Sequence, residues 1–163
     1  MKKFLFAAAA ILCAVLLSVN LTSCGDDKSE PDMTIQYYCG GSTDNDYSYF
    51  PHETDKAAAQ AVYEGLLKEL KTIITGQEWS VKYNNSNRDE VIKREDEAAK
   101  KKYADMETKL MAFKNKVDNL DKTQGKNKFA FGIEVTIACK HTLATGTTTL
   151  ESRTISIKYN GDE

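Results

Sequence analysis

Hydrophobic and polar residues alternate in several segments of the chain, and this period of two predicts strands with one buried face. The first segment is residues 33–39, and Gly40-Gly41 ends its alternation. The clearest segment is residues 129–140, and a further alternation over residues 153–159 follows a turn-rich stretch. These last two segments predict a hairpin, in which Leu150 is out of phase and indicates a bulge or a late strand start.

Apolar positions at helical spacing predict two helices. The first spans residues 54–75, with Gly76 placed as a left-handed C-cap. A short alternation of Trp79, Val81 and Tyr83 comes next and indicates a brief strand. Asn87, with Glu90 three residues later, is an N-cap signature for a second, long helix that extends to about Leu120.

The second predicted helix carries an apolar seam over its C-terminal two thirds. Its members are separated by steps of four and three residues, as in a heptad repeat: Ala99, Tyr103, Met106, Leu110, Phe113, Val117 and Leu120. Towards the N-terminus the seam would need Glu95 or Asp96, in a stretch dense with charges of both signs. At about 1.5 Å per residue this helix is roughly 50 Å long and the first about 33 Å. We therefore expect residues 88–98 to overhang the domain as an exposed, mobile contact surface.

The first thirty residues have the features of an export signal. Lys2 and Lys3 precede an apolar run of about 14 residues, whereas a membrane-spanning helix needs about 20. The segment ends in Leu21-Thr22-Ser23-Cys24, which resembles the lipobox of bacterial lipoproteins. The resemblance implies cleavage before Cys24 and attachment of a diacylglycerol to its sulfur. We therefore expect residues 1–23 to be a lipoprotein signal peptide.

The segment that follows the lipobox predicts a tether and a location. Residues 24–32 contain four acidic residues, one Pro and no large apolar side chain, so they cannot bury enough surface to fold. We expect a flexible tether there and a single domain at residues 33–160. An acidic stretch directly after the cysteine also resembles the surface-export signal of Bacteroidota lipoproteins. This resemblance implies an outer-membrane lipoprotein displayed at the cell surface, with a periplasm-facing position as the alternative.

Two cysteines remain once the signal peptide and the lipidated Cys24 are set aside. Cys39 and Cys139 would lie in an oxidising compartment, in phase with buried strand faces, which favours a disulfide over two separate thiols. Each cysteine stands at the C-terminal end of its predicted strand, so we expect these strands to be parallel neighbours. The expected fold class is α+β, with a small mixed sheet of three to four strands and the element order β-α-β-α-β-β. Both helices, the second one long, would pack on one face and leave the other face wet.

Charge and composition argue against several classes of function. The chain has 22 Lys and Arg against 24 Asp and Glu and no dense basic face, so we expect no nucleic-acid partner. We expect no enzyme, cofactor or metal site, because each candidate lacks a necessary part. His52 and His141 lack a third zinc ligand, and Cys139 points inward, away from any open nucleophile site. Asp44-Asn45-Asp46 lacks the spacing of a calcium loop.

Aromatic residues provide the candidate ligand contacts. Tyr38, Tyr47 and Tyr49 could stack against a sugar, although aromatic residues more often anchor the core or loops. The sequence predicts a lipid-anchored, non-catalytic interaction or structural module that contacts another envelope or surface protein. The alternative is a glycan- or small-ligand-binding accessory lipoprotein, which a concave pocket lined by these tyrosines would favour.

Overall fold

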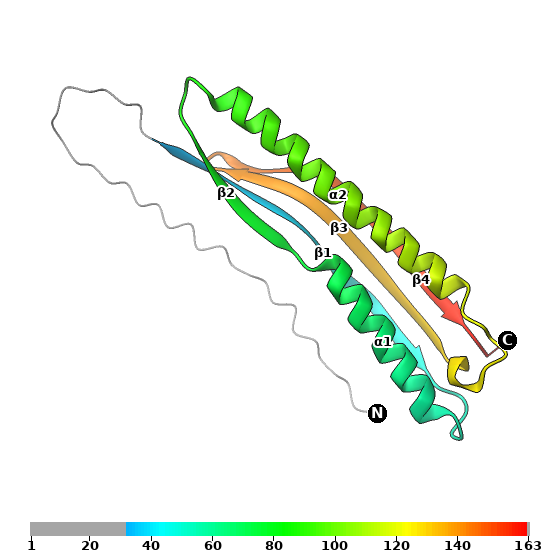
Figure 1. Cartoon of the computed structure of the whole chain (residues 1–163). Helices are drawn as coiled ribbons and strands as arrows, with labels where there is room; N and C mark the ends of the chain where they lie inside the picture. The colour runs from blue at the N-terminus through cyan, green and yellow to red at the C-terminus, as the bar shows by residue number, and fades with distance from the viewer. Residues whose placement is uncertain (1–31, 163) are drawn as a thin grey trace.

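The fold was obtained as a computed structural model that describes residues 32–162 (Figure 1). The predicted signal peptide, the lipobox and nearly all of the predicted tether lie outside the described residues. In chain order the elements are β1 (Met33–Tyr49), α1 (Lys56–Ile74), β2 (Gln77–Tyr83), α2 (Arg88–Asp118), the short 3-10 helix η1 (Gly125–Asn127), β3 (Ala130–Leu143) and β4 (Gly146–Asn160). This confirms the α+β class, the element order and the long second helix.

The four strands form one open antiparallel sheet in the order β2-β1-β3-β4. Both helices lie on the same face of this sheet, as predicted (Figure 1). The helix α2 runs along the whole length of the sheet: it lies over β1 and β3 near Ala99 and reaches β4 near Glu107, and α1 lies beside it along the second half of β1. The molecule is therefore long and two-layered, with one face of the sheet covered by helices.

The core lies between the helices and the inner face of the sheet, which we define as the face that the helices cover. Alternate residues of the strands point into it, because neighbouring side chains of a strand lie on opposite faces. These buried strand residues are Ile35, Tyr37, Cys39, Phe131, Ile133, Val135, Ile137, Cys139, Ile155, Ile157 and Tyr159. All members of the predicted α2 seam from Ala99 to Val117 are buried against them, and Leu120 packs at its edge just beyond the helix.

The prediction that β1 stops at Gly40-Gly41 is wrong. The strand continues to Tyr49, although residues 42–49 are all exposed. A stretch with no buried face leaves no alternation in the sequence, and pairing with β3 is what keeps it extended. A bulge at Asn45 and Asp46 interrupts this pairing, and Asn45 adopts a left-handed backbone with a φ of 51°.

The predicted disulfide between Cys39 and Cys139 is present, but the predicted parallel direction of its strands is wrong. The two cysteines lie directly opposite each other in an antiparallel pair, with their Cα atoms 4.2 Å apart. The part of β3 beyond Cys139 pairs with the part of β1 before Cys39, and the part of β1 beyond Cys39 pairs with the part of β3 before Cys139. Antiparallel pairing therefore leaves neither strand without a partner. The hairpin of β3 and β4 and its bulge at Leu150 are confirmed, since the register passes from Cys139–Glu151 to Lys140–Thr149.

The predicted overhang of residues 88–98 is also wrong. Val91 is buried, and Glu95 and Asp96 are partly buried against the sheet. The strands β1 and β3 have 17 and 14 residues, so the sheet, and not α1, determines how much of α2 is covered.

Gly76 is not a left-handed C-cap. The helix α1 ends at Ile74, Thr75 has a φ of −55°, and the chain passes into β2 at Gln77. The Tyr38 ring packs against Gly76, where a Cβ would lie 2.7 Å from Tyr38 Cε2. At this position the glycine is needed for close approach and not for its backbone angle.

Candidate interaction surface

The face of the sheet opposite the helices carries mainly small and polar residues, and we call it the outer face. The prediction that helices leave one face of the sheet uncovered is therefore confirmed. Its hydroxyls bond to each other across strands: Thr136 with Thr154 at 2.8 Å, and Thr142 with Thr147 at 2.9 Å. The register places these residues on it: Thr34, Gln36, Tyr38, Gly40, Ser42, Asp44, Tyr47, Tyr49, Glu78, Ser80, Lys82, Ala130, Gly132, Glu134, Thr136, Ala138, Lys140, Thr142, Thr147, Thr149, Ser152, Thr154, Ser156, Lys158 and Asn160.

Two of the three predicted contact residues lie together at one end of this outer face. Tyr47 is opposite Gly132 and Tyr49 is opposite Ala130. Their exposures of 54% and 60% make them the exposed large hydrophobic residues of the described chain. Residues two apart on a strand are about 6.6 Å apart, so the two rings form one patch, which we call the tyrosine pair.

The tyrosine pair is held in place by the strand beneath it. The Tyr47 ring lies against Gly132, where any side chain would collide with Tyr47 Cε1. Next to the pair, Asn45 Nδ2 donates a hydrogen bond of 2.8 Å to Glu134 Oε2. Lys158 is opposite Gly132 on the far side of β3. Sequence reasoning identified Tyr47 and Tyr49 but not Gly132, because the close approach depends on strand register.

Tyr38 does not belong to the same patch. It lies nine positions before Tyr47 on β1, which is roughly 30 Å at 3.3 Å per residue. Its ring packs over Gly40 and Gly76, and Lys140 Nζ lies 5.2 Å from the ring centre. The three tyrosines therefore do not line a common concave pocket.

A buried polar cluster connects α2 to the inner face of the sheet near Cys39. The Tyr37 hydroxyl donates to Asp96 Oδ1 at 2.9 Å, and His141 Nδ1 lies 2.9 Å from the same oxygen. Trp79 stacks on Tyr37 and its Nε1 donates to Glu95 Oε2 at 3.3 Å. Burial raises the pKa of the Tyr37 hydroxyl above its usual range, and the hydrogen bond to Asp96 and the nearby carboxylates raise it further.

This cluster explains the break in the apolar seam. Asp96 takes a seam position, and its carboxylate is satisfied by Tyr37 and by His141, which has only 8% of its side chain exposed. Sequence reasoning missed the contact, although two signals were present: Asp96 interrupts the seam, and His141 is in phase with Cys139. The cluster connects α2 to the sheet, because Asp96 belongs to α2 while Tyr37 and His141 belong to β1 and β3.

The other residues weighed as chemistry are engaged elsewhere in the described fold. His52 lies between β1 and α1 and pairs with Asp162 at 2.8 Å, whereas His141 belongs to β3. Cys139 is in the disulfide, and Asn45 of the acidic turn forms the β1 bulge. Within residues 32–162 no three His, Cys, Asp or Glu side chains are arranged to hold a metal ion. None of the helices in that range is long and apolar enough to cross a membrane.

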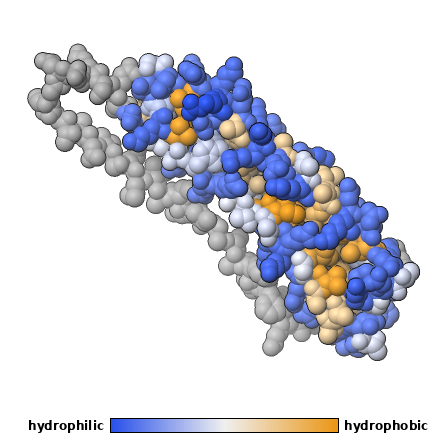
Figure 2. Space-filling view, viewed as in Figure 1, coloured by the Kyte–Doolittle hydropathy of each residue, from blue (hydrophilic) through white to orange (hydrophobic). Residues whose placement is uncertain are grey.

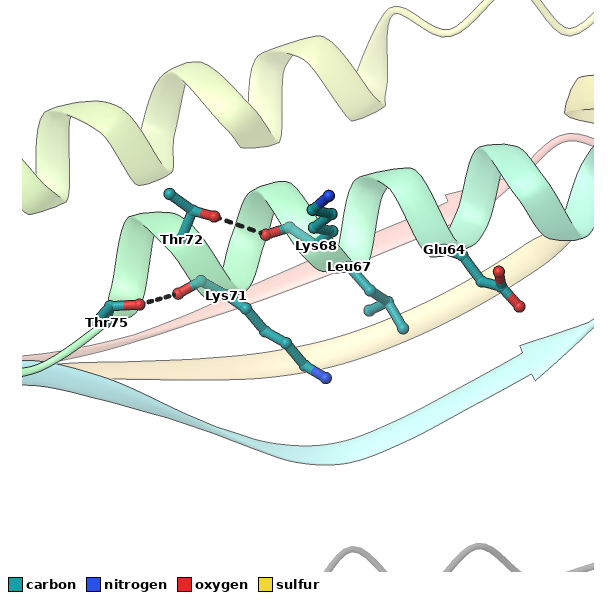
Figure 3. A pocket seen from close by; sticks show the side chains of 6 residues that line it. All are labelled: Glu64, Leu67, Lys68, Lys71, Thr72 and Thr75. Carbon is teal, nitrogen blue, oxygen red and sulfur yellow. Dashed lines mark hydrogen bonds between the residues drawn. The ribbon is translucent and has the colours of Figure 1, made fainter.

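The helix side presents shallow hollows. One hollow of about 390 Å³ lies along α1 and is lined by Glu64, Leu67, Lys68, Lys71, Thr72 and Thr75 (Figure 3). The hydroxyls of Thr72 and Thr75 donate to carbonyls of their own helix, so they do not point into it as free groups. Figure 2 shows this side of the molecule as mainly hydrophilic, with hydrophobic side chains in separate spots.

The outer face is thus a sheet surface that no helix of the described fold covers, and the exposed tyrosine pair lies at one end of it. Tyr is favoured in protein interfaces because its large ring is amphipathic and has few rotatable bonds. Comparisons of this chain with protein-family profiles, with curated proteins and with solved structures found no match.

Proposed function

We propose that this protein is a lipid-anchored, non-catalytic interaction module of the bacterial outer membrane that contacts another envelope or surface protein through the outer face of its sheet. The observation that carries the proposal is the one-sided sheet. Its inner face is sealed by helices, while its outer face is uncovered and ends in an exposed tyrosine pair. The N-terminal lipobox supports the anchor, and the acidic residues after Cys24 support display at the cell surface.

The anchor is tested by replacing Cys24 with Ala in the full chain expressed in its natural type of host. The expected result is release of the protein from the membrane fraction, because a soluble fold without a lipid has no other anchor in this proposal. Ser23→Ala, which keeps a small residue before the cysteine, is the matched control and should remain membrane-bound. Membrane retention of the Cys24→Ala protein with normal processing would contradict lipid attachment. Protease treatment of intact cells then separates a surface-exposed from a periplasm-facing position.

The interaction surface is tested by crosslinking in cells. A photoreactive residue at Thr136, in the middle of the outer face, is expected to capture a protein partner. The matched control carries the same residue at Lys101, an exposed position on α2 on the other side of the molecule. Equal capture from both positions, or capture from Lys101 alone, would mean that the outer face is not the contact surface.

A glycan ligand is the second candidate, and the tyrosine pair is the observation that favours it. Two exposed tyrosines whose backbone positions are about 6.6 Å apart, next to Asn45, Glu134 and Lys158, could stack on a sugar chain and bond its hydroxyls. Replacing both Tyr47 and Tyr49 with Ala should then abolish binding to immobilised polysaccharide. Lys101→Ala is the control and should bind normally. Retained binding in the double variant would remove this candidate.

A further inference from the structure

The strand β4 is a free edge of the sheet. Within residues 32–162 it pairs with β3 only, and its register is regular from Glu151 to Asn160. A free edge presents unpaired backbone N–H and C=O groups, which is a template for another strand. The opposite edge is less suitable: it consists of β2, which has only seven residues, and of the part of β1 beyond it, which is interrupted by the bulge at Asn45 and carries Asp44 and Asp46.

The position of the disulfide shows which backbone groups of β4 face outward. A Cα–Cα distance of 4.2 Å between Cys39 and Cys139 is that of a non-hydrogen-bonded pair, so the N–H and C=O of Cys139 point towards β4. The backbone N–H and C=O groups of successive residues point to opposite sides of a strand. The groups of Glu151, the partner of Cys139 on β4, therefore point back to β3, and so do those of every second residue after Glu151. The groups that point to the free edge belong to Ser152, Thr154, Ser156, Lys158 and Asn160.

The flank of α2 that overlies this edge has a regular pattern of charge. Glu107 marks the flank, because Arg153 Nη1 of β4 bonds to Glu107 Oε1. Residues at helical spacing from Glu107 share that side, since steps of three, four and seven return to the same face. Those nearest its centre are Glu107, Met111 and Lys114, and Lys114 also pairs with Asp118 of its own helix. In an antiparallel copy centred on Met111, Glu107 comes level with Lys114 of the partner subunit, because the two residues stand four and three positions from Met111.

The centre of this pattern lies level with the centre of the free edge. The Ala99 carbonyl oxygen is 3.2 Å from Cys139 Sγ, which places Ala99 at the level of that cysteine. Ser156 is opposite Glu134, five residues back along β3, which is about 17 Å at 3.3 Å per residue. The same distance along α2 corresponds to about 11 residues at 1.5 Å each, which leads to Met111 or its neighbour.

We propose that a second copy of this chain docks on the β4 edge, with a twofold axis that passes beside Ser156 and Met111. The two β4 strands would pair antiparallel and join both sheets into one. Ser156 would face Ser156 of the partner subunit, and Thr154 would face Lys158 of the partner subunit, so no like charges meet. This arrangement uses all five outward-facing residues of the edge. The self-complementary contact is the kind that a twofold dimer requires.

The helices fit the same arrangement. Near Glu107 the helix α2 reaches β4, so at the level of Met111 it lies over β3 and β4, and two copies of α2 would be separated there by about two strand spacings, or roughly 9.6 Å. Packed helices are typically 8–10 Å apart, so the copies would touch without overlap. Glu107 would then meet Lys114 of the partner subunit. The inference is independent of lipid attachment and of the partner that the outer face binds.

Charge exchange tests the helix contact. Residues 25–163, which contain the whole described core, are studied by sedimentation velocity over a wide range of concentration. The unmodified chain is expected to dimerise. Lys114→Glu places a carboxylate opposite Glu107 of the partner subunit, and Glu107→Lys places an ammonium group opposite Lys114 of the partner subunit. Each variant should dimerise at least about tenfold more weakly alone, and the mixture of the two should recover association. A monomeric unmodified chain, or variants that dimerise normally alone, would overturn the proposal.

A cysteine on the axis tests the strand register. In the Ser156→Cys variant the new thiols of two copies face each other and should form an intermolecular disulfide. Thr136→Cys is the matched control and should stay uncrosslinked. Thr136 also lies on the outer face, but its strand β3 is flanked by β1 and β4 and is therefore not at the edge. Ser156→Lys provides a variant with an intact fold, since the lysine is opposite Glu134 of its own chain, and it should weaken the dimer at least about tenfold. Dimers that crosslink equally through both cysteines, or that tolerate Ser156→Lys, would place the contact elsewhere.

Discussion

Asp96 is the residue on which the position of the N-terminal half of α2 depends. Its carboxylate accepts from Tyr37 and bonds to His141, and both partners come from the sheet. A buried donor that loses its acceptor costs about 1–3 kcal/mol, whereas an exposed ion pair contributes little. The cluster therefore replaces apolar packing at the point where the seam is interrupted.

Replacing Asp96 with Ala should lower the free energy of unfolding by roughly 2–4 kcal/mol, because two buried groups lose one acceptor. Urea denaturation measures the change. The control is Asp105→Ala, which removes an exposed carboxylate paired with Lys109 and should cost less than about 0.5 kcal/mol. Equal effects of the two substitutions would mean that the cluster does not hold the helix.

The pH dependence of stability follows from the buried tyrosines. Burial raises the pKa of Tyr37, Tyr63, Tyr103 and Tyr159 in the folded state. A raised pKa means that the fold favours the neutral hydroxyl. This contribution is complete below the unfolded pKa of about 10 and is lost as pH rises above it, because the unfolded chain then releases protons that the fold retains.

The free energy of unfolding should therefore fall between about pH 10 and pH 12. In Tyr37→Phe the slope of this fall should correspond to about one proton fewer released on unfolding. Denaturation at a series of pH values measures the slope. Tyr49→Phe removes an exposed hydroxyl and serves as the control, which should keep the slope of the unmodified chain. An unchanged slope in Tyr37→Phe would show that its hydroxyl is not shielded in the fold.

At the scale of elements, the contact between α2 and the sheet depends on a small residue above the disulfide. Ala99 is fully buried, and its carbonyl oxygen lies against the sulfurs of Cys39 and Cys139. Ala99→Leu should cost about 1–3 kcal/mol, because extra atoms in a filled core force the helix away. Ala98→Leu adds the same atoms at an exposed position of the same helix and should be nearly neutral. Similar melting temperatures for both variants would contradict this packing.

The disulfide connects β1 to β3 across a sequence separation of 100 residues. Constraining a loop of that length in the unfolded chain contributes at most about 4.7 kcal/mol in the chain-entropy model. The variant with both Cys39→Ala and Cys139→Ala should lose a large part of that stability, as measured by denaturation with and without a reductant. The reductant should have no effect on this variant. Two free thiols in the denatured, unreduced chain would contradict the disulfide.

At the scale of the whole molecule, the length of the sheet gives the anchored protein a direction. Eight residues from Gly25 to Asp32 extend at most about 28 Å, whereas β1 alone has 17 residues, or roughly 56 Å. If Cys24 carries the lipid, as proposed, the end of the sheet near Met33 faces the membrane. The tyrosine pair then lies at the far end, where a partner outside the membrane can reach it.

Fluorescent labels on the lipidated protein in vesicles test this orientation. A label at Thr145, in the hairpin turn near the Met33 end, should be quenched strongly by quenchers in the lipid headgroups. A label at Lys122, in the connection from α2 to the start of β3 beside Tyr49, should be quenched weakly. Equal quenching at both positions would mean that the sheet lies flat on the bilayer.

Local patterns in the sequence were enough to predict most elements of this protein. Alternation identifies a strand wherever one face is buried, and a spacing of three and four identifies the face of a helix that meets the core. For that reason β2, β3, β4, the apolar seam of α2, the bulge at Leu150 and the phase of both disulfide cysteines could be predicted. The residues of the tyrosine pair could be selected by type, but not placed on a common face.

Tertiary structure alone decided the second half of β1, the antiparallel direction of β1 and β3, and the burial of Asp96. Residues 42–49 have no buried face, so only hydrogen bonds to a strand some 90 residues away keep them extended. Strand direction follows from how far both strands continue past their cysteines, which depends on that same pairing. Asp96 looks like a solvated charge until Tyr37 and His141 reach it from two strands. Each of these features rests on contacts between distant segments, and local periodicity contains no information about such contacts.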